Sequence, residues 1–245
     1  MLILITGAAG HIGQALCGFL AGHGFQLRGF DRRPCDGVHE QVLGDIEDLP
    51  ALRAAARGAD AVVHLAARPD NADFATQLVP ANVIGLYNIL EAARLEGVGR
   101  IILAGSFRAG GLPARREPLA AADRSPEDPY GLTKLWAEDM GRMYAQRYGL
   151  SVLVVRLGWV LRNTGELRDM ERMPAGRDYF LSHGDLRRFF LAALGAERAA
   201  TFEVLYAVSH PGATTAFDVA PAARAIGFKP CDTFPDGIDW RSDAP

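Results

Sequence analysis

The chain has few cysteines, little net charge and no long apolar run, and each shortage excludes a class of protein. Its three cysteines, Cys17, Cys35 and Cys231, show neither C-x-x-C nor metal-ligand spacing, which speaks against a disulfide framework and favours reduced thiols in the cytoplasm. The net charge is only −3 over 245 residues and the arginines are scattered among acids, so we expect no nucleic-acid partner. No stretch approaches the length of a membrane span, and the N-terminus has no charged leader, so we expect a cytoplasmic protein without a membrane partner.

What the chain does contain is a glycine-rich turn directly after an apolar strand at its N-terminus. Residues 2–5 are apolar, as a strand buried on both faces requires. Gly7, Gly10 and Gly13 follow at a G-x-x-G-x-x-G spacing, and a helix is predicted over residues 12–21. The first glycine permits a tight turn, the second lets the backbone approach a pyrophosphate, and the third lets the helix pack closely on the strand. The stretch therefore predicts a dinucleotide-binding turn.

The end of the second predicted strand bears on the choice between NAD and NADP. This strand, residues 25–30, ends in Asp31 about 20 residues after the turn. A carboxylate there accepts hydrogen bonds from the ribose hydroxyls and repels a 2′-phosphate, which favours NAD. Arg32 and Arg33 follow directly, and they could bind a 2′-phosphate or be solvated loop charges. NAD is the preferred cofactor, and NADP stays open.

The alternation of strands and helices along the chain predicts an α/β fold, a doubly wound Rossmann-type parallel sheet with a small C-terminal substrate lobe. Further strands are expected at 40–43, 59–66, 98–104, 152–160 and 202–208, and further helices at 49–57, 82–95, 129–148, 186–194 and 217–226. Irregular chain is expected at 107–129, at 161–178 and in a loose tail at 232–245. Residues 1–160 would form the NAD-binding core, and residues 161–245 the small lobe, interleaved with the last strand and helix of the core.

Several polar residues in these elements have structural interpretations. Asp45 would bind the adenine amine, with Ile46 against the ring, or cap the helix at 49–57, and the two roles are compatible. His64 lies inside an apolar strand and is interpreted as a core histidine. Asn82 and Asn88 would tie down neighbouring backbone.

The sequence also suggests roles for four later residues. Arg156 either serves the pocket or ties strand ends together. Ser182 and Asp185 have the spacing of a capping box at a helix start, and His183 between them is left only a smaller chance of contacting substrate.

A tyrosine and a lysine one helical turn apart suggest catalysis. Tyr130 and Lys134 project from one face of the predicted helix 129–148. An ammonium near a phenol favours the ionised phenol, and lowering a tyrosine pKa from about 10 by about 3 units takes roughly 4 kcal/mol. Tyr130 would be the general base of a hydride transfer, Lys134 would tune it and hold the nicotinamide ribose, and Ser106 would hydrogen-bond the reacting oxygen.

These motifs resemble the extended branch of the short-chain dehydrogenase/reductase superfamily, the NAD-dependent epimerases and dehydratases, and within it the uronate dehydrogenases, which oxidise C1 of hexuronates with NAD. The resemblance includes VVHLAA at 62–67, NVIGLYNILEAAR at 82–94, YGLTKLWAE at 130–138, YFLSHGD at 179–185 and IGFKP at 226–230. It implies catalytic roles for Ser106, Tyr130 and Lys134, passage of residues 157–160 beside the nicotinamide, and a homodimer through helices 82–95 and 129–148.

Two departures from those dehydrogenases concern the substrate. Phe107 and Arg108 stand where the dehydrogenases follow the serine with asparagine and histidine. The arginine that clamps the hexuronate carboxylate has two candidates, Arg172 and Arg177, neither in clean register. A charged substrate stays plausible, because Arg108, Arg172 and Arg177 could converge on an anion.

The sequence therefore predicts an NAD-dependent oxidoreductase acting on a CH–OH group of a small sugar or sugar acid. The alternatives are a sugar epimerase or dehydratase with tightly held NAD, and a non-catalytic dinucleotide-binding regulatory protein. The predicted cofactor-binding residues are Gly7, Ala9, Gly10, His11, Ile12, Gly13, Asp31, Arg32, Asp45, Ile46, Leu65, Ala66, Ala67, Asn82, Tyr130, Lys134 and Leu157. The predicted substrate-binding residues are Ser106, Phe107, Arg108, Tyr130 and Arg177, and no metal site is predicted.

Overall fold

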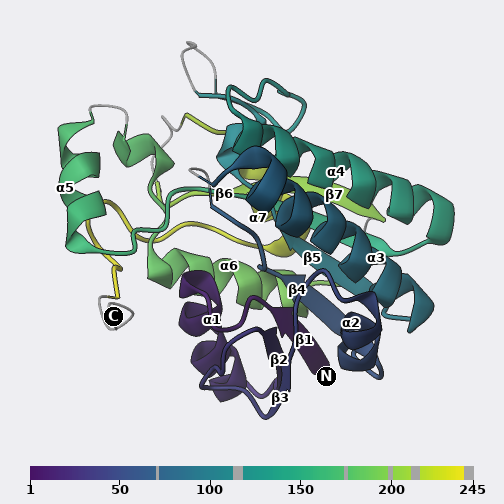
Figure 1. Ribbon diagram of the computed structural model, residues 1–245. Helices are drawn as coiled ribbons and strands as arrows, with labels where there is room; N and C mark the ends of the chain where they lie inside the picture. The colour runs from purple at the N-terminus through teal and green to yellow at the C-terminus, as the bar shows by residue number, and fades with distance from the viewer. Residues whose placement is uncertain (70–71, 113–117, 174–175, 198–200, 211–215, 240–245) are drawn as a thin grey trace.

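Seven parallel strands form one sheet at the centre of the computed structural model (Figure 1). The structure describes residues 1–69, 72–112, 118–173, 176–197, 201–210 and 216–239. The strands lie in the order β3-β2-β1-β4-β5-β6-β7, and each neighbouring pair is parallel. Their bounds are β1 Leu2–Thr6, β2 Gln26–Asp31, β3 Glu40–Leu43, β4 Ala61–His64, β5 Arg100–Ala104, β6 Ser151–Leu157 and β7 Phe202–Ala207. This topology confirms the predicted Rossmann-type fold.

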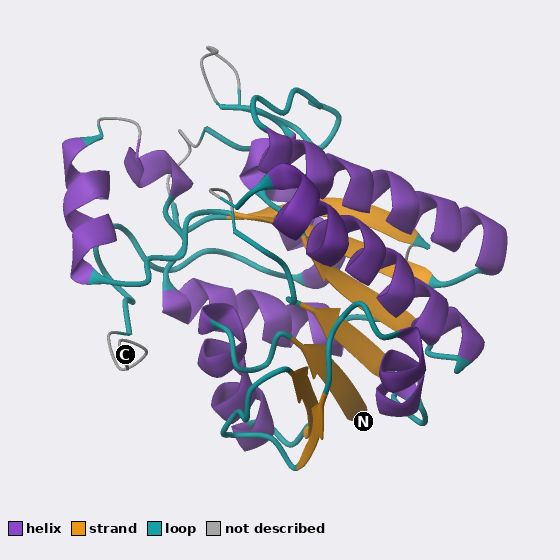
Figure 2. Cartoon of the chain, viewed as in Figure 1, coloured by secondary structure: helices purple, strands orange, loops and turns teal. Residues whose placement is uncertain are grey.

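Helices cover both faces of the sheet (Figure 2). On one face lie α1 His11–Gly22, α6 His183–Gly195 and α7 Ala220–Ile226, and on the other α2 Leu49–Ala56, α3 Gly85–Leu95 and α4 Pro129–Tyr148. Because both faces are covered, the central strands are continuously apolar rather than alternating. None of the helices in the described chain has both the length and the apolar character that crossing a bilayer requires.

The strand order reverses between β1 and β4, and this reversal positions the site. β1 is followed in the sheet by β2 on one side and by β4 on the other. The two loops that leave the carboxyl ends of β1 and β4 therefore diverge to opposite faces. A crevice opens at such a switch point, where ligands bind in doubly wound folds.

His64, at the carboxyl end of β4, is a core histidine, as predicted. Its Nδ1 lies 2.7 Å from the Thr6 hydroxyl on the neighbouring strand, and burial, with Lys134 nearby, lowers its pKa to about 3. Since the unfolded chain takes up this proton near pH 6.5 and the folded chain does not, stability falls as the pH drops from 6.5 towards 3.

We expect His64 to lower the free energy of unfolding by about 1.4 kcal/mol for each pH unit below 6.5 in that window. In a Thr6→Val, His64→Leu double variant, the urea unfolding free energy should fall less steeply between pH 6.5 and 4 than in the wild type. A His23→Leu variant, which changes an exposed histidine, should keep the wild-type slope. Equal slopes in the wild type and the double variant would contradict the assignment.

Arg156 ties elements together and does not line the cleft. It is fully buried and donates to both oxygens of Glu138 on α4, from Nε at 2.7 Å and from Nη2 at 3.0 Å. Its Nη1 donates to the Tyr206 hydroxyl at 2.6 Å and to the Asp123 carbonyl at 2.9 Å. This resolves the two sequence interpretations in favour of the structural one, because the guanidinium joins β6, β7, α4 and the loop before α4.

The segment expected to be irregular at 161–178 contains a helix, α5 Thr164–Arg172, followed by a 3-10 turn, η3 Gly176–Tyr179. The Asn163 side chain accepts from the Glu166 N–H and starts the helix. Leu167 and Met170 then pack on Phe180. The prediction was wrong because the apolar partner of this short, polar helix lies in later chain. Figure 1 shows α5 set apart from the sheet.

The C-terminal segment 232–239 is not a loose tail. The Asp232 carboxylate accepts from the Ser182 hydroxyl at 2.5 Å and pairs with Arg188 at 2.7 Å. Phe234 packs edge-on against Phe180, with centroids 5.3 Å apart. The segment therefore belongs to the folded lobe, and the remaining residues of the predicted tail, 240–245, lie outside the described part.

Other element boundaries needed smaller corrections. Asp48, not Asp45, caps α2, accepting from the Ala51 N–H at 3.0 Å. The helix predicted from 82 begins at 85 as α3 and follows a π-helical segment, η1 Phe74–Ile84. In the loop 107–129, whose residues 113–117 lie outside the described part, a short turn forms, η2 Phe107–Ala109, and Leu119 makes an isolated bridge to Phe217. Because Phe217 belongs to that bridge, the last helix begins at 220 rather than 217.

Candidate active site

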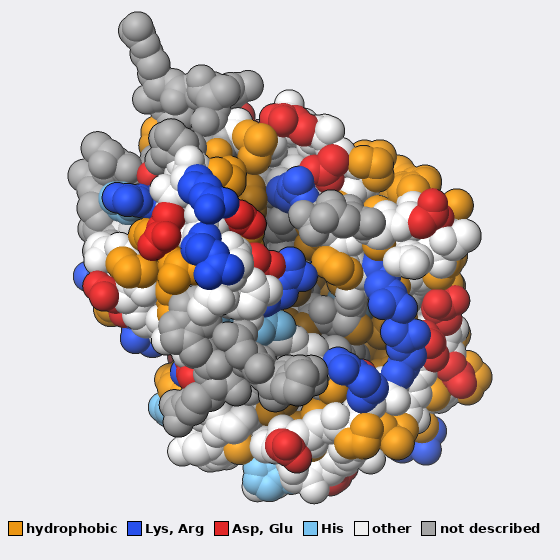
Figure 3. Space-filling model, turned by 60° about the vertical axis from the view of Figure 1, so that its left-hand side comes forward, with side chains coloured by type: hydrophobic (Ala, Val, Ile, Leu, Met, Phe, Trp, Pro, Cys, Tyr) orange, Lys and Arg blue, Asp and Glu red, His pale blue; other side chains and the backbone are white. Residues whose placement is uncertain are grey.

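Two adjoining cavities open at the carboxyl edge of the sheet, where the strand order reverses. The larger has a volume of about 580 Å³ and the smaller about 250 Å³. Residues of the glycine turn and of the loop after β4 line both: Gly7, Gly10, Leu65, Ala67 and Arg68. Figure 3 shows this side of the molecule hollowed at its middle, with blue Lys or Arg and pale blue His side chains around the hollow. The two cavities form one elongated cleft.

The glycine turn needs glycine for space as well as for conformation. Gly7 has φ +74°, and a Cβ added there would lie 2.6 Å from the Ala66 nitrogen. A Cβ on Gly13 would collide with the Gly7 carbonyl oxygen. α1 begins after Gly10 without a side-chain cap from the described residues, and the first N–H groups of a helix have no acceptor within the helix itself. Such a helix start binds phosphate, and the turn fits the pyrophosphate of a dinucleotide.

The smaller cavity has the features of an adenosine site. Asp31 ends β2, and its carboxylate accepts from the Ala9 N–H and the Arg33 N–H, each at 3.1 Å. Arg32 pairs with Asp45 at 3.7 Å across the cavity mouth. Arg33 donates instead to the Ala9 carbonyl at 3.0 Å. Backbone groups of the turn therefore hold Asp31 and Arg33. The orientation of these two side chains does not depend on a ligand.

The larger cavity brings together the three residues predicted to be catalytic. Ser106 follows β5, while Tyr130 and Lys134 lie on the first turns of α4, and all three line the cavity. α4 begins where it does because Asp128 accepts from the Gly131 N–H at 2.7 Å and Pro129 occupies the first turn. The Ser106 hydroxyl oxygen accepts from the Arg108 N–H at 3.3 Å, which orients it.

Lys134 is a buried cation. It is 7% exposed, its Nζ donates to the Ala104 carbonyl at 2.9 Å, and burial lowers its pKa to about 8. The Nζ lies 5.6 Å from the centroid of the Tyr130 ring, and the Arg108 guanidinium lies 6.0 Å from the same centroid. Arg108 itself pairs with Asp128 at 3.1 Å. Two positive groups therefore lie within 6.0 Å of the centre of the Tyr130 ring.

Most predicted site residues line the cleft, and three do not. Ala9 lies behind the turn, where its N–H holds Asp31. Asn82 is buried, accepts from the Arg68 N–H at 2.8 Å and donates to the Arg68 carbonyl at 3.2 Å and to Thr133; it holds in place the backbone of a residue that lines both cavities. The Arg177 guanidinium lies over the Phe234 ring, 5.6 Å from its centroid. Asn88 donates to the Ile46 and Glu47 carbonyls, as expected of a structural residue.

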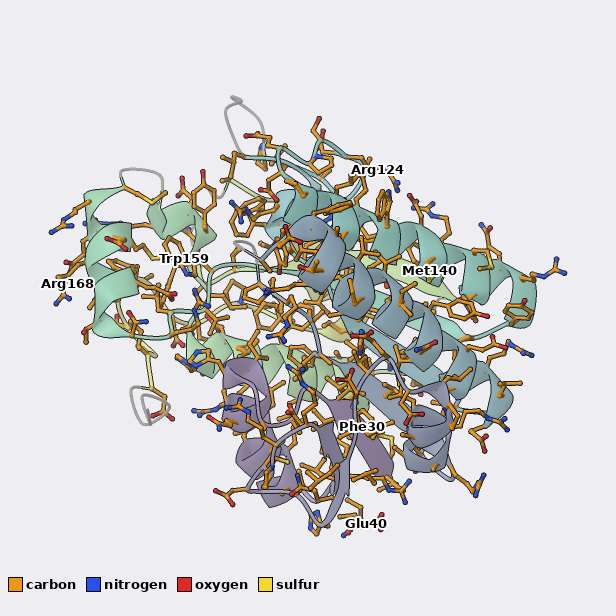
Figure 4. All side chains as sticks on the ribbon, viewed as in Figure 1. Phe30, Glu40, Arg124, Met140, Trp159 and Arg168 are labelled. Carbon is orange, nitrogen blue, oxygen red and sulfur yellow. The ribbon has the colours of Figure 1, made fainter. Side chains whose placement is uncertain are left out.

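The cleft is also lined by residues that were not among the predicted site residues. Around the larger cavity these are Arg68, Pro69, Leu112, Trp159, Arg162, Met173 and Tyr179. Tyr179 stacks on Phe107 with centroids 5.0 Å apart and planes 9° apart. Figure 4 shows Trp159 between the end of the sheet and α5, and its Nε1 donates to Glu166, which also binds Arg162. Trp159 lies in the stretch 157–160 that was expected beside the nicotinamide, and Tyr179 begins the YFLSHGD match, whereas no local pattern marks the other residues of this list.

The comparisons agree with this geometry. Residues 3–177 match the model of the NAD dependent epimerase/dehydratase family. The chain is 37% identical over 161 residues to the uronate dehydrogenase of Pseudomonas putida, a match that covers 64% of this chain and 60% of the relative. It is 32% identical to the L-arabinose 1-dehydrogenase (NAD(P)(+)) of Haloferax volcanii, over 94% of this chain and 96% of the relative.

A solved structure is also similar. A mutant uronate dehydrogenase from Agrobacterium tumefaciens, complexed with NAD, is 29% identical with a TM-score of 0.81, covering 94% of this chain and 84% of that one. The fold, the glycine turn at the switch point and the family match over more than half of the chain lead to one conclusion. This chain belongs to the NAD-dependent epimerase/dehydratase family.

Proposed function

We propose that this protein is an NAD-dependent dehydrogenase that oxidises a CH–OH group of a small sugar or sugar acid. The observation that carries the proposal is that Ser106, Tyr130 and Lys134 line one cavity that continues into the glycine turn. A proton acceptor, its cation and an oxygen-binding hydroxyl thus lie within reach of a bound dinucleotide. The sugar dehydrogenases among the relatives support the same class of reaction.

Each residue has a distinct part in this reaction. NAD, when bound, supplies the hydride acceptor. Ser106 hydrogen-bonds the substrate oxygen, and Tyr130 takes the hydroxyl proton. Lys134, whose pKa of about 8 leaves it mostly charged at pH 7, stabilises the Tyr130 phenolate that accepts this proton and so becomes a neutral phenol. Burial in a low-dielectric site strengthens that stabilisation.

The substrate end of the cavity suits a small polyol or its acid. We assign its wall to the lobe formed by residues 161–245 with the loop after β5, and the NAD-binding core to residues 1–160. The stacked rings of Phe107 and Tyr179 offer a flat apolar face to a sugar ring, and Arg108 and Arg162 offer cations for a carboxylate. The names of the relatives, uronate and L-arabinose dehydrogenase, favour the same substrates.

A screen of free sugars and uronates with NAD and with NADP tests the function. A dehydrogenase gives NADH in a one-to-one ratio with the oxidised sugar, read by absorbance. An epimerase or dehydratase would convert a sugar without net NADH, and a regulatory protein would bind NAD without turnover. Either of those results would overturn the proposal.

We expect an Asp31→Asn variant to lose much of its preference for NAD over NADP. The Ala9 and Arg33 N–H groups donate to different oxygens of Asp31, so the amide keeps an acceptor for one of them while it removes the charge that repels a 2′-phosphate. Relief of one like-charge contact should change the ratio of kcat/KM for NAD and NADP by about tenfold, the equivalent of 1.4 kcal/mol. An Asp36→Asn variant, an equal change of charge on the loop after β2, should keep the wild-type ratio. An unchanged ratio in Asp31→Asn would contradict the role of this carboxylate.

We also propose a homodimer through α3 and α4 and a cytoplasmic location. Large apolar side chains are exposed along these two helices: Tyr87, Leu95, Trp136, Met143 and Tyr148, each between 38% and 46% exposed. Such a row is typical of an interface, and sedimentation equilibrium should give twice the chain mass of 26.4 kDa. Cys17, Cys35 and Cys231 all carry free thiols, as proteins of reducing compartments do.

A further inference from the structure

We propose that His11 donates a hydrogen bond from its Nδ1–H to the pyrophosphate of the bound dinucleotide, and that His183 and the backbone N–H of Asp239 set the tautomer of His11 that makes this donor. The proposal rests on the dinucleotide binding of the proposed function. It makes His11 a cofactor-binding residue and His183 a positioning residue, and it gives the C-terminal segment a part in cofactor binding.

The side chains of His11 and His183, which lie far apart in the sequence, are in contact. His11 is the first residue of α1 and lines the larger cavity, while His183 is the first residue of α6 and is 1% exposed. Their Nε2 atoms are 3.0 Å apart, and the rings meet edge to face with centroids at 5.0 Å. At this distance one Nε2 donates its proton and the other accepts it.

The backbone of Asp239 decides which histidine is the donor. Its N–H lies 3.2 Å from His183 Nδ1, and a backbone N–H can only donate. His183 Nδ1 therefore carries no proton, and the neutral ring has its proton on Nε2. That proton points to His11 Nε2, which must accept it. The neutral His11 ring then carries its own proton on Nδ1.

The Asp239 backbone is held by contacts that involve no ligand. The Asp239 carboxylate accepts from Arg187 Nη2 at 2.8 Å, and Arg187 Nε donates to the Ala15 carbonyl at 2.8 Å. Arg187 lies on α6 and Ala15 on α1, the helices that begin with the two histidines. The same pair of helices thus fixes both the histidines and the segment that sets their protons.

A neutral N–H donor at this place complements the helix start. A pyrophosphate carries two negative charges, and the first N–H groups of α1 supply backbone donors to such an anion. Hydrogen bonds to charged acceptors are about twice as strong as those between neutral groups. Among the described residues, no group of three His, Cys, Asp or Glu could hold a metal ion, so the contact between the two rings is a hydrogen bond rather than part of a metal site.

The test combines variants with ligand fragments and does not depend on turnover. Binding of ADP-ribose and of AMP is measured by calorimetry for the wild type, His11→Phe, His183→Phe and the double variant. We expect His11→Phe to weaken ADP-ribose binding about tenfold, as loss of one hydrogen bond to a charged group does, and to change AMP binding by less than twofold. His183→Phe should weaken ADP-ribose binding about threefold alone and have no further effect in the His11→Phe background.

A long-range ¹H–¹⁵N spectrum of the wild-type protein tests the tautomers without any variant. We expect the proton of His11 on Nδ1 and that of His183 on Nε2. Arg187→Gln, which releases Asp239 without altering either ring, should shift His11 towards the Nε2–H tautomer. This keeps the test informative if His183→Phe does not fold.

Two results would overturn the proposal. One is a wild-type His11 with its proton on Nε2, and the other is ADP-ribose binding that His11→Phe leaves unchanged. A wild-type protein that binds no ADP-ribose would overturn the dinucleotide function itself together with this proposal, so the two failures are distinguishable.

Discussion

A Tyr130→Phe variant should lose a factor of about 10² to 10⁴ in kcat while its affinity for NADH stays within about twofold. General base catalysis contributes rate enhancements of that size, and the substitution removes only the hydroxyl that takes the substrate proton. The Tyr130 ring would still lie beside Lys134 and Arg108, so the cavity keeps its shape. Initial rates at saturating sugar, together with fluorescence titration of NADH, measure both quantities.

A Tyr148→Phe variant is the matched control. Tyr148 is the last residue of the same helix and is 45% exposed, so it tests the loss of a phenol from α4 far from the cavity. Its kcat should equal that of the wild type. Wild-type kcat in Tyr130→Phe would remove Tyr130 from catalysis and would favour a protein that binds the dinucleotide without using this phenol.

A Lys134→Met variant should have opposite effects on activity and on stability. We expect kcat to fall at least about 100-fold, because the phenolate at Tyr130 loses its adjacent cation. The cofactor-free protein should nevertheless become more stable at pH 7. Burial lowers the pKa of Lys134 from 10.5 to about 8, so a charged Lys134 costs up to about 3 kcal/mol in the folded state, and loss of the hydrogen bond to Ala104 offsets about 1 kcal/mol of that gain.

The pH dependence of this gain gives a sharper test. Between pH 8 and 10.5 the unfolded chain binds the Lys134 proton and the folded chain does not, so wild-type stability rises with pH in this window. The methionine variant lacks that rise, and its advantage in urea unfolding free energy should shrink towards pH 10. Lys229→Met removes an equal charge from an exposed position and should show neither effect. A variant with lower stability than the wild type at pH 7 would contradict the buried-charge account.

The burial of Lys134 has a cost in stability that its proposed catalytic role explains. A cation in a desolvated cavity costs stability in the empty protein, and the cost is returned when an anionic phenolate forms beside it. The neighbouring Arg156 and Glu138 pair is buried too, but each charge has its full set of partners. That pair therefore stabilises the join between α4 and β6, whereas Lys134 stays available for chemistry.

Two elements, α4 and β3, were predicted to the residue. α4 spans 129–148 as predicted, because Asp128 and Pro129 start it and Gly149, with φ +71°, ends it. β3 was likewise predicted with its observed bounds. α5 was missed, because Leu167 and Met170 face Phe180 and the C-terminal segment rather than the main core. Local sequence carries caps and periodicity, but it does not show which distant surface an apolar side chain will meet.

The same division holds in the site. The glycine turn, Asp31 and the pair of Tyr130 and Lys134 are local patterns, and the structure gathers them along one cleft. Arg177 was selected by its place in the sequence, yet it lies over Phe234. Trp159 lies in the stretch 157–160 expected beside the nicotinamide and Tyr179 begins the YFLSHGD match, but neither was predicted as a site residue; Arg162 lines the cavity without any motif.

The sequence by itself determined the sheet, the dinucleotide turn and the catalytic candidates, because each depends on residues within a few positions of one another. Only the tertiary structure decided the electrostatics and the wall of the cleft: the depressed pKa of Lys134 and the contact of His11 with His183. The physical reason is that burial and hydrogen-bond partners come from segments far apart in the chain, and neither is encoded in a local pattern.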